Sequence, residues 1–475
     1  MMTQKSTTNI LQDESKNNSI LNGINWKTTV LIIVLNVIFQ LSESYSIIFG
    51  FIGAALFLVS LLIIDTDQYV YYYVAIACSR RLMEIYNIPL LSVITIIFFA
   101  QRYILSENIY RSRINKQVLL SFVLLLLYSM RFFFLNYSFS APILVIKLFF
   151  CILMLADCFN DCKTKEDVTK TLDLLIFYFS LGVTIACTVS LVINSSTGNL
   201  ERFSLSEENS TNILSIYAAS GISVIATRLF SEISKTMKIV MVVMIAPLLY
   251  VGFLTQSRTF IVMLAIIFAW VMAFGVASER YRNIVVKVFI AVMVGVILFL
   301  IFGKNTSFYE LMNKIIERFT NPKDDDITNG RDIIWKLYMA RMLGSAKFMF
   351  FGNDGVTPSP AGGSMAHNMY LEMFYTYGLV GLVVIIWIYA TLFVTLKKRF
   401  AECGFNKSMV FGTLPFILVW VAGMGSHTLL GTMPTIEFFL GVCCIYCTQF
   451  SYEKKKPDRD SDLIDKGNLT RRLRN

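Results

Sequence analysis

The chain has 475 residues, of which 56% are hydrophobic, and apolar runs recur from Thr28 to Phe450. Most long segments would be insoluble in water unless lipid covered them, which excludes a water-soluble globular protein. The formal net charge is +10. Because the Lys and Arg residues cluster beside apolar runs, as the positive-inside rule requires, we expect no nucleic acid partner. The composition predicts an all-α, polytopic membrane protein in contact with the lipid bilayer.

The apolar runs predict about twelve to fourteen transmembrane helices, because about 20 helical residues cross a hydrocarbon core of about 30 Å. The expected spans are, in chain order, Thr28 to Leu41, Tyr45 to Ile64, Tyr69 to Ser79, Ile88 to Leu105, Val118 to Asn136, Ala141 to Ala156, Thr171 to Ile193, Asn212 to Phe230, Lys238 to Leu254, Thr259 to Ala277, Ile284 to Phe302, His367 to Leu396, Ser408 to Ser426 and Thr435 to Phe450. The span at Tyr69 is short and is followed by Arg80 and Arg81. If this segment lies at the membrane interface and does not cross the bilayer, the orientation of the helices before it is reversed.

The spans divide the chain into five regions. Residues 1–27 form a polar cytoplasmic segment without the order of a cleavable secretion signal, so the first span is expected to remain as an anchor. Residues 28–302 hold the N-terminal spans, 303–366 one large external loop, 367–450 the C-terminal spans and 451–475 a basic cytoplasmic tail. Because basic loops belong inside, the large loop and the turn from Thr255 to Arg258 are expected to face outward.

The external loop is too long for a simple connector and is expected to be partly helical. Apolar residues recur at helical spacing from Phe308 to Phe319, with charged residues between them. This pattern predicts an amphipathic helix that lies on the membrane or caps a cavity. A second helix is predicted to begin near Gly330 and to carry Ile334, Leu337 and Tyr338 on one face.

Several cations lie toward the outer side, against the positive-inside trend. Arg131 and Lys147 lie in the outward halves of predicted spans, and Arg202, Arg258 and Arg331 lie in outward segments. This charge indicates an anionic ligand, and arginine suits phosphate through its bidentate hydrogen bonds and permanent charge. The alternative is that these side chains extend to lipid headgroups or pair structurally.

His367, one of two histidines, lies where the external loop enters a span. An unperturbed histidine titrates at about pH 6.5, so it can accept a proton from a hydroxyl at neutral pH. The alternative role is to cap the following helix. His427 lies at the outer end of another span, and Glu372 and Glu437 could pair with an arginine or act as an alternative base.

Neither a metal nor another cofactor is expected. Cys443, Cys444 and Cys447 are one ligand short of a tetrahedral site, and no histidine lies close to them in sequence. They are interpreted as small packing residues. The run from Asp324 to Asp326 lacks further ligands at a recognisable spacing and is interpreted as a solvated loop.

The motifs SRTF at Arg258, GRDIIW at Arg331, FFGNDG, and HNMYLEMFYTYGLVG from His367 resemble those of the bacterial O-antigen polymerase and O-antigen ligase superfamily. The segment ERFSLSEENSTN around Arg202 is a weaker match, and the resemblance extends from Asn199 to Phe393. It implies a metal-independent, inverting glycosyltransferase on the outer face of the bacterial cytoplasmic membrane. Its donor and acceptor would be polyprenyl-diphosphate-linked oligosaccharides.

The resemblance also implies roles for individual residues. Arg258 and Arg331 would bind the diphosphate, with Arg202 following them, and His367 would be the general base or would orient the acceptor. Arg331 is thereby a catalytic candidate beside His367, and the charge pattern adds Arg131 and Lys147 as further diphosphate ligands.

Within the superfamily we favour a polymerase of O-antigen, capsule or exopolysaccharide repeat units over a ligase that transfers glycan to a lipid A core. A flippase and a chain-length regulator are candidate protein partners. A lipid-linked oligosaccharide flippase is an alternative function from another class, and a non-enzymatic assembly factor is a third. A flippase is expected to have a central cavity and repeat symmetry, whereas here the polar groups gather on one side.

Overall fold

The computed structural model describes the chain in fourteen stretches, and every structural statement below concerns these residues. They are 23–44, 46–76, 84–85, 88–89, 116–136, 140–160, 162–195, 211–230, 233–279, 281–320, 331–353, 366–405, 412–424 and 432–447.

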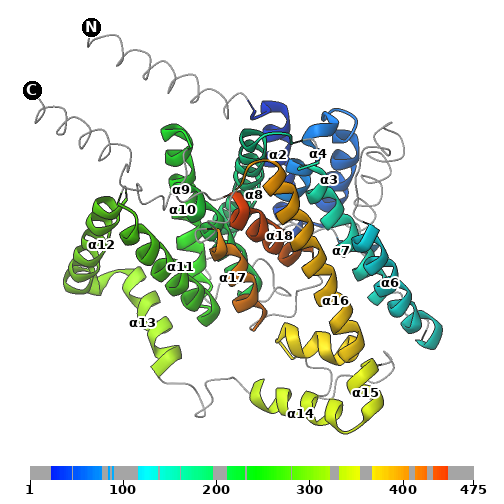
Figure 1. Ribbon diagram of the computed structural model, residues 1–475. Coiled ribbons are helices and arrows are strands. Elements are labelled where there is room, and N and C mark those ends of the chain that lie inside the picture. The colour runs from blue at the N-terminus through cyan, green and yellow to red at the C-terminus, as the bar shows by residue number, and fades with distance from the viewer. Residues whose placement is uncertain are drawn as a thin grey trace, which may run out of the picture.

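The first part of the chain forms long helices and one short hairpin (Figure 1). Its elements are α2 (Trp26–Ser44), α3 (Ile47–Ser60), the 3-10 turn η1 (Thr66–Gln68), α4 (Tyr69–Ile76), β1 (Glu84–Ile85), β2 (Ile88–Pro89), α6 (Lys116–Asn136), α7 (Ser140–Asp157), α8 (Lys165–Ser195) and α9 (Thr211–Leu229). Strands β1 and β2 pair antiparallel. Residues Ile88 and Pro89 therefore belong to a hairpin and not to the helix predicted from Ile88 to Leu105, whose other residues lie outside the described part.

The second part is also helical. Its elements are α10 (Lys235–Leu254), α11 (Arg258–Ala277), α12 (Arg282–Phe302), the 3-10 turn η5 (Gly303–Asn305), α13 (Ser307–Thr320), α14 (Arg331–Leu343), α15 (Ala346–Phe351), α16 (Met369–Glu402), α17 (Thr413–Gly423) and α18 (Thr432–Cys447). The predicted bounds agree with most of these helices to within a few residues. Helix α8 begins six residues before the expected start at Thr171, because its first turn is polar and carries Glu166 and Asp167.

The fold class is confirmed. In the described part of the chain, seven helices are long and apolar enough to cross a membrane: α6, α8, α9, α10, α11, α12 and α16. Shorter apolar helices, among them α2, α3 and α17, pack with them. The protein is thus an all-α, multi-pass membrane protein, while the total of twelve to fourteen spans stays a prediction.

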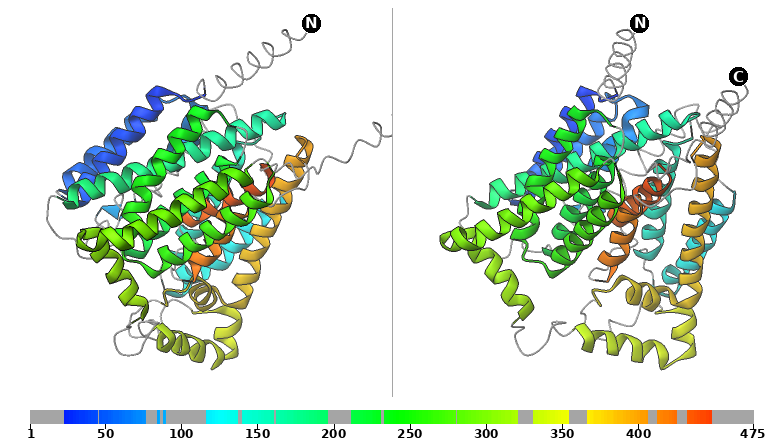
Figure 2. Two further views of the ribbon diagram at one scale, coloured as in Figure 1. Left: turned by 90° about the vertical axis from the view of Figure 1, so that its left-hand side faces the viewer. Right: turned by 60° about the vertical axis from the view of Figure 1, so that its left-hand side comes forward.

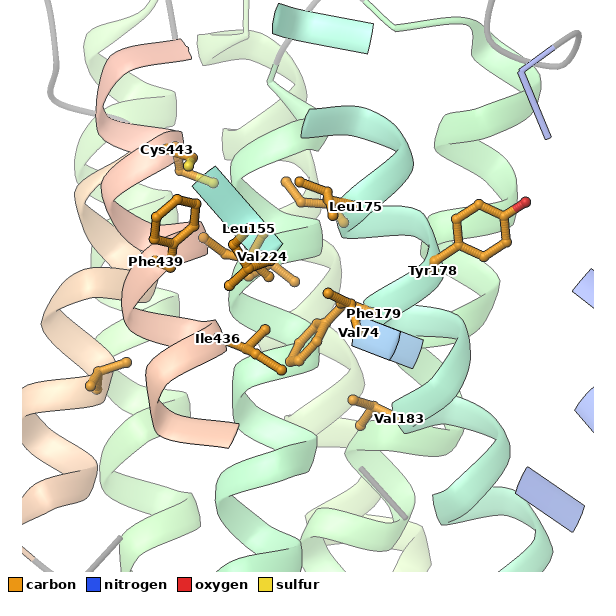
Figure 3. Packing of buried hydrophobic residues seen from close by; sticks show 14 of the residues in the cluster. Val74, Leu155, Leu175, Tyr178, Phe179, Val183, Val224, Ile436, Phe439 and Cys443 are labelled. Atoms are coloured by element: carbon orange, nitrogen blue, oxygen red, sulfur yellow. The ribbon is translucent and has the colours of Figure 1, made fainter. Parts of the chain in front are cut away.

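The core lies where α4, α7, α8, α9 and α18 meet. Figure 3 shows Val74, Leu155, Leu175, Val224 and Ile436 from these five helices directed toward one another, and all five are buried. All eight residues of α4 are buried. The eight described residues of α4 rise about 12 Å, which is less than the thickness of the bilayer core, and they form a buried piece of the protein core.

Helices α14 and α15 and the first part of α16 gather at one end of the molecule, the lower end in Figures 1 and 2. Helix α13 is amphipathic, as predicted: Leu311 and Ile315 are buried, whereas Glu310, Lys314 and Glu317 are exposed. Its Phe308 ring lies 5.9 Å from that of Phe253 in α10. The segment expected as an external loop therefore holds three helices, which agrees with its partly helical character.

Candidate active site

His367 sits in a turn that is held by its neighbours. Its φ angle is 49°, a left-handed conformation that is uncommon for a residue other than glycine. The next residue, Asn368, is the N-cap of α16, and its side chain accepts hydrogen bonds from the backbone N–H groups of Tyr370 and Leu371, at 3.0 and 3.2 Å. The carboxylate of Glu372 accepts hydrogen bonds from the backbone N–H groups of Ala366 and His367. The histidine-asparagine pair thus forms a capped helix entrance.

Helix α14 brings Arg331 to this entrance. Arg331 is its first residue, and Trp335, one turn later, donates a hydrogen bond from Nε1 to the carbonyl oxygen of Ala366 at 2.8 Å. Residues four apart lie on one face of a helix, so the Trp335 anchor turns Arg331 toward His367. Below them, Tyr338 and Met342 pack against Ala366 and Tyr375 in a small apolar cluster.

One detail of the predicted second helix is wrong. Leu337 was expected on the same face as Ile334 and Tyr338, but it is 43% exposed, whereas Tyr338 is 3% exposed. The apolar face instead consists of Ile334, Trp335, Tyr338 and Met342. Trp335 takes the place of Leu337 on this face because its indole N–H donates a hydrogen bond to the carbonyl oxygen of Ala366 and its side chain packs against the buried cluster.

The two candidate residues interact electrostatically. The pKa of His367 is lowered from its ordinary value, first by partial burial and second by the positive charge of Arg331. Both effects disfavour the protonated imidazole. At neutral pH the ring is therefore uncharged and can accept a proton, which is the state that a general base requires.

A sharp kink divides α16 directly after this entrance. Gly378 has φ 63° and ψ −174°, so the helical segment from Met369 ends at Tyr377 and a second segment begins beyond it. Gly378 contacts Gly352, which also has positive φ, at 73°. A Cβ atom on Gly352 would lie 2.5 Å from the Gly378 nitrogen, and one on Gly378 would lie 2.5 Å from the Phe350 oxygen. Only glycine fits at both positions, and we call this contact the glycine joint.

The helix end at the glycine joint receives its hydrogen bonds from outside. Where a helix stops, its last carbonyl groups lose their intrahelical donors. Here the backbone N–H of Asn353 donates to the Tyr375 oxygen at 2.6 Å, and Arg131 Nη2 donates to the Thr376 oxygen at 3.2 Å. The Tyr128 hydroxyl lies 2.7 Å from the Tyr377 oxygen and 2.9 Å from the Phe351 oxygen. Helix α6 and the turn after α15 therefore fix the direction of the segment that carries His367.

Arg131 is thus placed at a helix end. Besides its bond to Thr376, its guanidinium lies 4.3 Å from the ring centroid of Tyr128 and 4.7 Å from that of Phe132. A cation beside the last carbonyl groups of a helix is favourable because these carry partial negative charge. This contact gives Arg131 a structural role, and its predicted role as a diphosphate ligand stays a prediction.

Arg258 contacts a different part of the external segment. It is the first residue of α11, and its guanidinium lies 5.9 Å from the ring of Phe319 near the end of α13. The preceding turn is tied to α9, because Ser257 Oγ donates to Asn212 Oδ1 at 2.9 Å and accepts from Ser215 Oγ at 3.2 Å. Gln256 in this turn has φ 49°, like His367. One left-handed residue is therefore a candidate site residue and the other lies two positions before one, and such strained backbone is often found at functional sites.

The remaining candidates are less fully described. Lys147 lies on α7 and Glu437 on α18, but their side chains are outside the described part, and so are Arg202, His427 and the run from Asp324 to Asp326. Cys443, Cys444 and Cys447 are buried in α18. Within the described stretches, no group of three His, Cys, Asp or Glu residues is arranged to hold a metal ion.

Sequence reasoning missed an ion pair in the core. Asp173 of α8 and Arg228 of α9 form a salt bridge, and both side chains are 1% exposed. Charges in a membrane helix usually find a partner in the bundle, so a search for opposite charges in adjacent spans could have found the pair.

Together these features define a class of protein. It is a multi-pass membrane protein in which a neutral histidine and an arginine meet at the entrance of a kinked helix, an arrangement suited to proton acceptance beside an anionic ligand. Residues 239–386 match a family model described as O-antigen ligase. This match confirms the resemblance to the O-antigen polymerase and ligase superfamily and includes Arg258, Arg331 and His367. Members of the family are glycosyltransferase-like enzymes. No curated protein matches the chain.

Proposed function

We propose that the protein is a polymerase of polyprenyl-diphosphate-linked oligosaccharide repeat units of the O-antigen, capsule or exopolysaccharide type. It would act on the outer face of the bacterial cytoplasmic membrane, by inverting glycosyl transfer that requires no metal. The observation that carries the proposal is that partial burial and the nearby charge of Arg331 lower the pKa of His367, inside the matched family region.

In the proposed reaction, the hydroxyl oxygen of the acceptor sugar attacks the anomeric carbon of the donor from the face opposite the diphosphate. The carbon–oxygen bond to the diphosphate breaks, and polyprenyl diphosphate leaves with the electron pair. His367 takes the hydroxyl proton, and inversion follows from the single displacement. The charge that develops on the leaving diphosphate is stabilised by Arg331 and Arg258, whose permanent charges need no proton transfer.

Helix α13 would cover the part of the site around Arg258. Its buried residues hold it against α10 and α11, and its Phe319 ring lies over Arg258. A cation that is partly shielded from water binds a diphosphate more strongly than an exposed one. The same covering would exclude water, which could otherwise hydrolyse the donor.

A ligase is the second candidate, favoured by the description of the matching family model. Both reactions use the same chemistry and differ in the acceptor. Deletion of the gene followed by electrophoresis of surface polysaccharide separates them. A polymerase deletion leaves glycan of a single repeat, whereas a ligase deletion leaves long polymer on the lipid carrier and none attached to the surface. Glycan that accumulates on the cytoplasmic side would contradict both and favour a flippase.

A further inference from the structure

Glu372 holds the turn at His367 with only one of its two carboxylate oxygens. The group accepts hydrogen bonds from the backbone N–H groups of Ala366 and His367. Its Oε1 atom is buried and finds no hydrogen-bond partner among the described residues. The two backbone bonds are therefore assigned to Oε2, and Oε1 remains available beside the histidine.

This arrangement is costly in the free protein. A carboxylate oxygen that is removed from water without a hydrogen-bond partner destabilises the folded protein. Rotation of the side chain cannot relieve this cost without breaking the bonds that hold the turn, because both backbone donors are fixed by the helix entrance. Such groups are rare in proteins and usually acquire a partner from water or a ligand.

The chemistry of Glu372 restricts the ligand. A carboxylate oxygen accepts hydrogen bonds and a protonated carboxyl group also donates one, so a hydroxyl group, which does both, suits Glu372 in either state. A diphosphate carries no such donor and suits the arginines instead. A sugar hydroxyl is therefore the part of the substrate that fits Glu372 Oε1.

We propose that Glu372 Oε1 accepts a hydrogen bond from a hydroxyl group of the acceptor sugar, next to the hydroxyl whose proton His367 takes. This inference rests on the proposed glycosyl transfer and assigns a further substrate-binding residue to it. Glu372 then has two functions: Oε2 fixes the turn of the base, and Oε1 orients the acceptor. The acceptor sugar is thereby held through two neighbouring hydroxyl groups by residues that are five positions apart at one helix entrance.

The substitution Glu372→Gln separates the two functions of this side chain, which are to fix the turn and to orient the acceptor. In Glu372→Gln, the amide oxygen can keep the bonds to the backbone N–H groups, while an NH2 donor replaces the acceptor Oε1. The full-length protein in lipid nanodiscs would receive a saturating lipid-linked repeat as donor and a fluorescent short-chain lipid-linked repeat as acceptor. We expect E372Q to raise the KM for the acceptor about tenfold, with kcat and thermal stability close to those of the wild type. Glu310→Gln, on the exposed face of α13, is the matched control and should leave both constants unchanged.

The outcomes are distinct. An E372Q protein with the acceptor KM of the wild type overturns the inference and leaves Glu372 as a residue that only holds the turn. If E372Q does not fold, Glu372→Asp replaces it, because the shorter side chain cannot keep the turn and reach the acceptor together, and an unchanged KM again overturns the inference. A wild-type protein that extends no acceptor overturns the proposed function and this inference with it.

Discussion

Backbone hydrogen bonds hold the turn that carries His367. The Glu372 carboxylate and the Trp335 indole bind the two peptide groups around Ala366, and Asn368 caps the helix that follows. A left-handed residue costs roughly 1–3 kcal/mol, which this set of bonds offsets. Partial burial, and after it the charge of Arg331, then lower the pKa of the imidazole and favour its neutral form.

The first prediction concerns the pH dependence of activity. Since burial and the Arg331 charge lower the pKa of His367, the base stays deprotonated and active below the pH at which an ordinary histidine would be protonated. Arg331→Gln removes the charge and raises this pKa, so the acidic limb of the kcat/KM profile should move to higher pH. Arg331→Lys retains the charge and should leave the limb close to its wild-type position, even if both variants are slower. If Arg331→Gln and Arg331→Lys had acidic limbs at the same pH, the charge of Arg331 would not act on the histidine.

The second prediction concerns the buried salt bridge between Asp173 and Arg228. Asp173→Asn leaves the Arg228 charge buried without its carboxylate, which is expected to cost about 3–5 kcal/mol of stability. Thermal unfolding in detergent measures this loss as a clear fall in Tm. Lys336→Gln is the control, since it removes an exposed pair with Asp332 in which the lysine is 79% exposed, and such pairs contribute about 0–1 kcal/mol. Equal Tm values for both variants would contradict a structural role for the core pair.

At the scale of elements, the kink in α16 sets the geometry of the site. The first segment of α16 lies with α14 and α15, and the second crosses the bundle beside α6 and α18 (Figure 1). The glycine joint fixes the angle between the two segments, and donors from α6 and the turn after α15 complete the helix end. The position of His367 relative to the membrane-spanning helices therefore depends on residues that lie far from it in sequence.

The third prediction tests the glycine joint. Alanine at Gly378 has to adopt positive φ and places its Cβ against the backbone of the FFGNDG turn, so we expect a loss of at least about 1–2 kcal/mol of stability together with a strong loss of transfer activity. Gly295→Ala is the control, because a Cβ there meets nothing within 4 Å, and alanine favours a helix over glycine by about 1 kcal/mol. Thermal unfolding and product electrophoresis provide the two readouts. Normal activity in Gly378→Ala would mean that the joint does not position the site.

The sequence predicted the helices far better than their interruptions. Apolar runs of about 20 residues identify spans because the bilayer fixes their length, and most bounds agree with the structure. The stretch from His367 to Leu396 was predicted as one helix because Gly378 lies in an apolar run and glycine is frequent in membrane helices. Its positive φ arises from the contact with Gly352, which no local pattern encodes. The short helix α4 was identified as doubtful from its length, but its complete burial is a property of the packed bundle.

At the scale of the whole molecule, the proposed function requires the end formed by α13, α14 and α15 to face outward. Basic loops assign the opposite ends of the spans to the cytoplasm, because positive residues are retained on that side. This orientation stays a prediction, and it decides whether the site can reach donor and acceptor on the outer face.

The fourth prediction tests this orientation by cysteine labelling. Lys336→Cys on α14 should react with a membrane-impermeant maleimide in intact cells from which any outer membrane has been removed, since this side chain is exposed. Lys163→Cys, also exposed but in a predicted cytoplasmic loop, should react only after the membrane is permeabilised. The wild-type chain corrects for labelling of the native cysteines. The reverse pattern would place the site on the cytoplasmic side and contradict the proposed reaction.

The candidate site was predicted in part. The motifs named Arg331, His367 and Arg258, and the structure brings the first two together through Trp335. The bond from Trp335 to Ala366 joins residues 31 positions apart, and the packing that creates it depends on tertiary structure. For the same reason the sequence could not show that Arg131 binds the end of a helix 245 positions away. Such contacts follow from the kink, which the sequence pattern did not reveal.

The central claim is that Arg331 and His367 together perform glycosyl transfer. The most direct measurement is the rate at which the purified protein in lipid nanodiscs lengthens a polyprenyl-diphosphate-linked repeat in the presence of a metal chelator. We predict that the wild type forms polymer, that Arg331→Ala and His367→Ala slow chain extension at least about a hundredfold, and that Lys336→Gln on the exposed face of α14 extends chains at the wild-type rate. A folded His367→Ala protein that extends chains as fast as the wild type would contradict the claim.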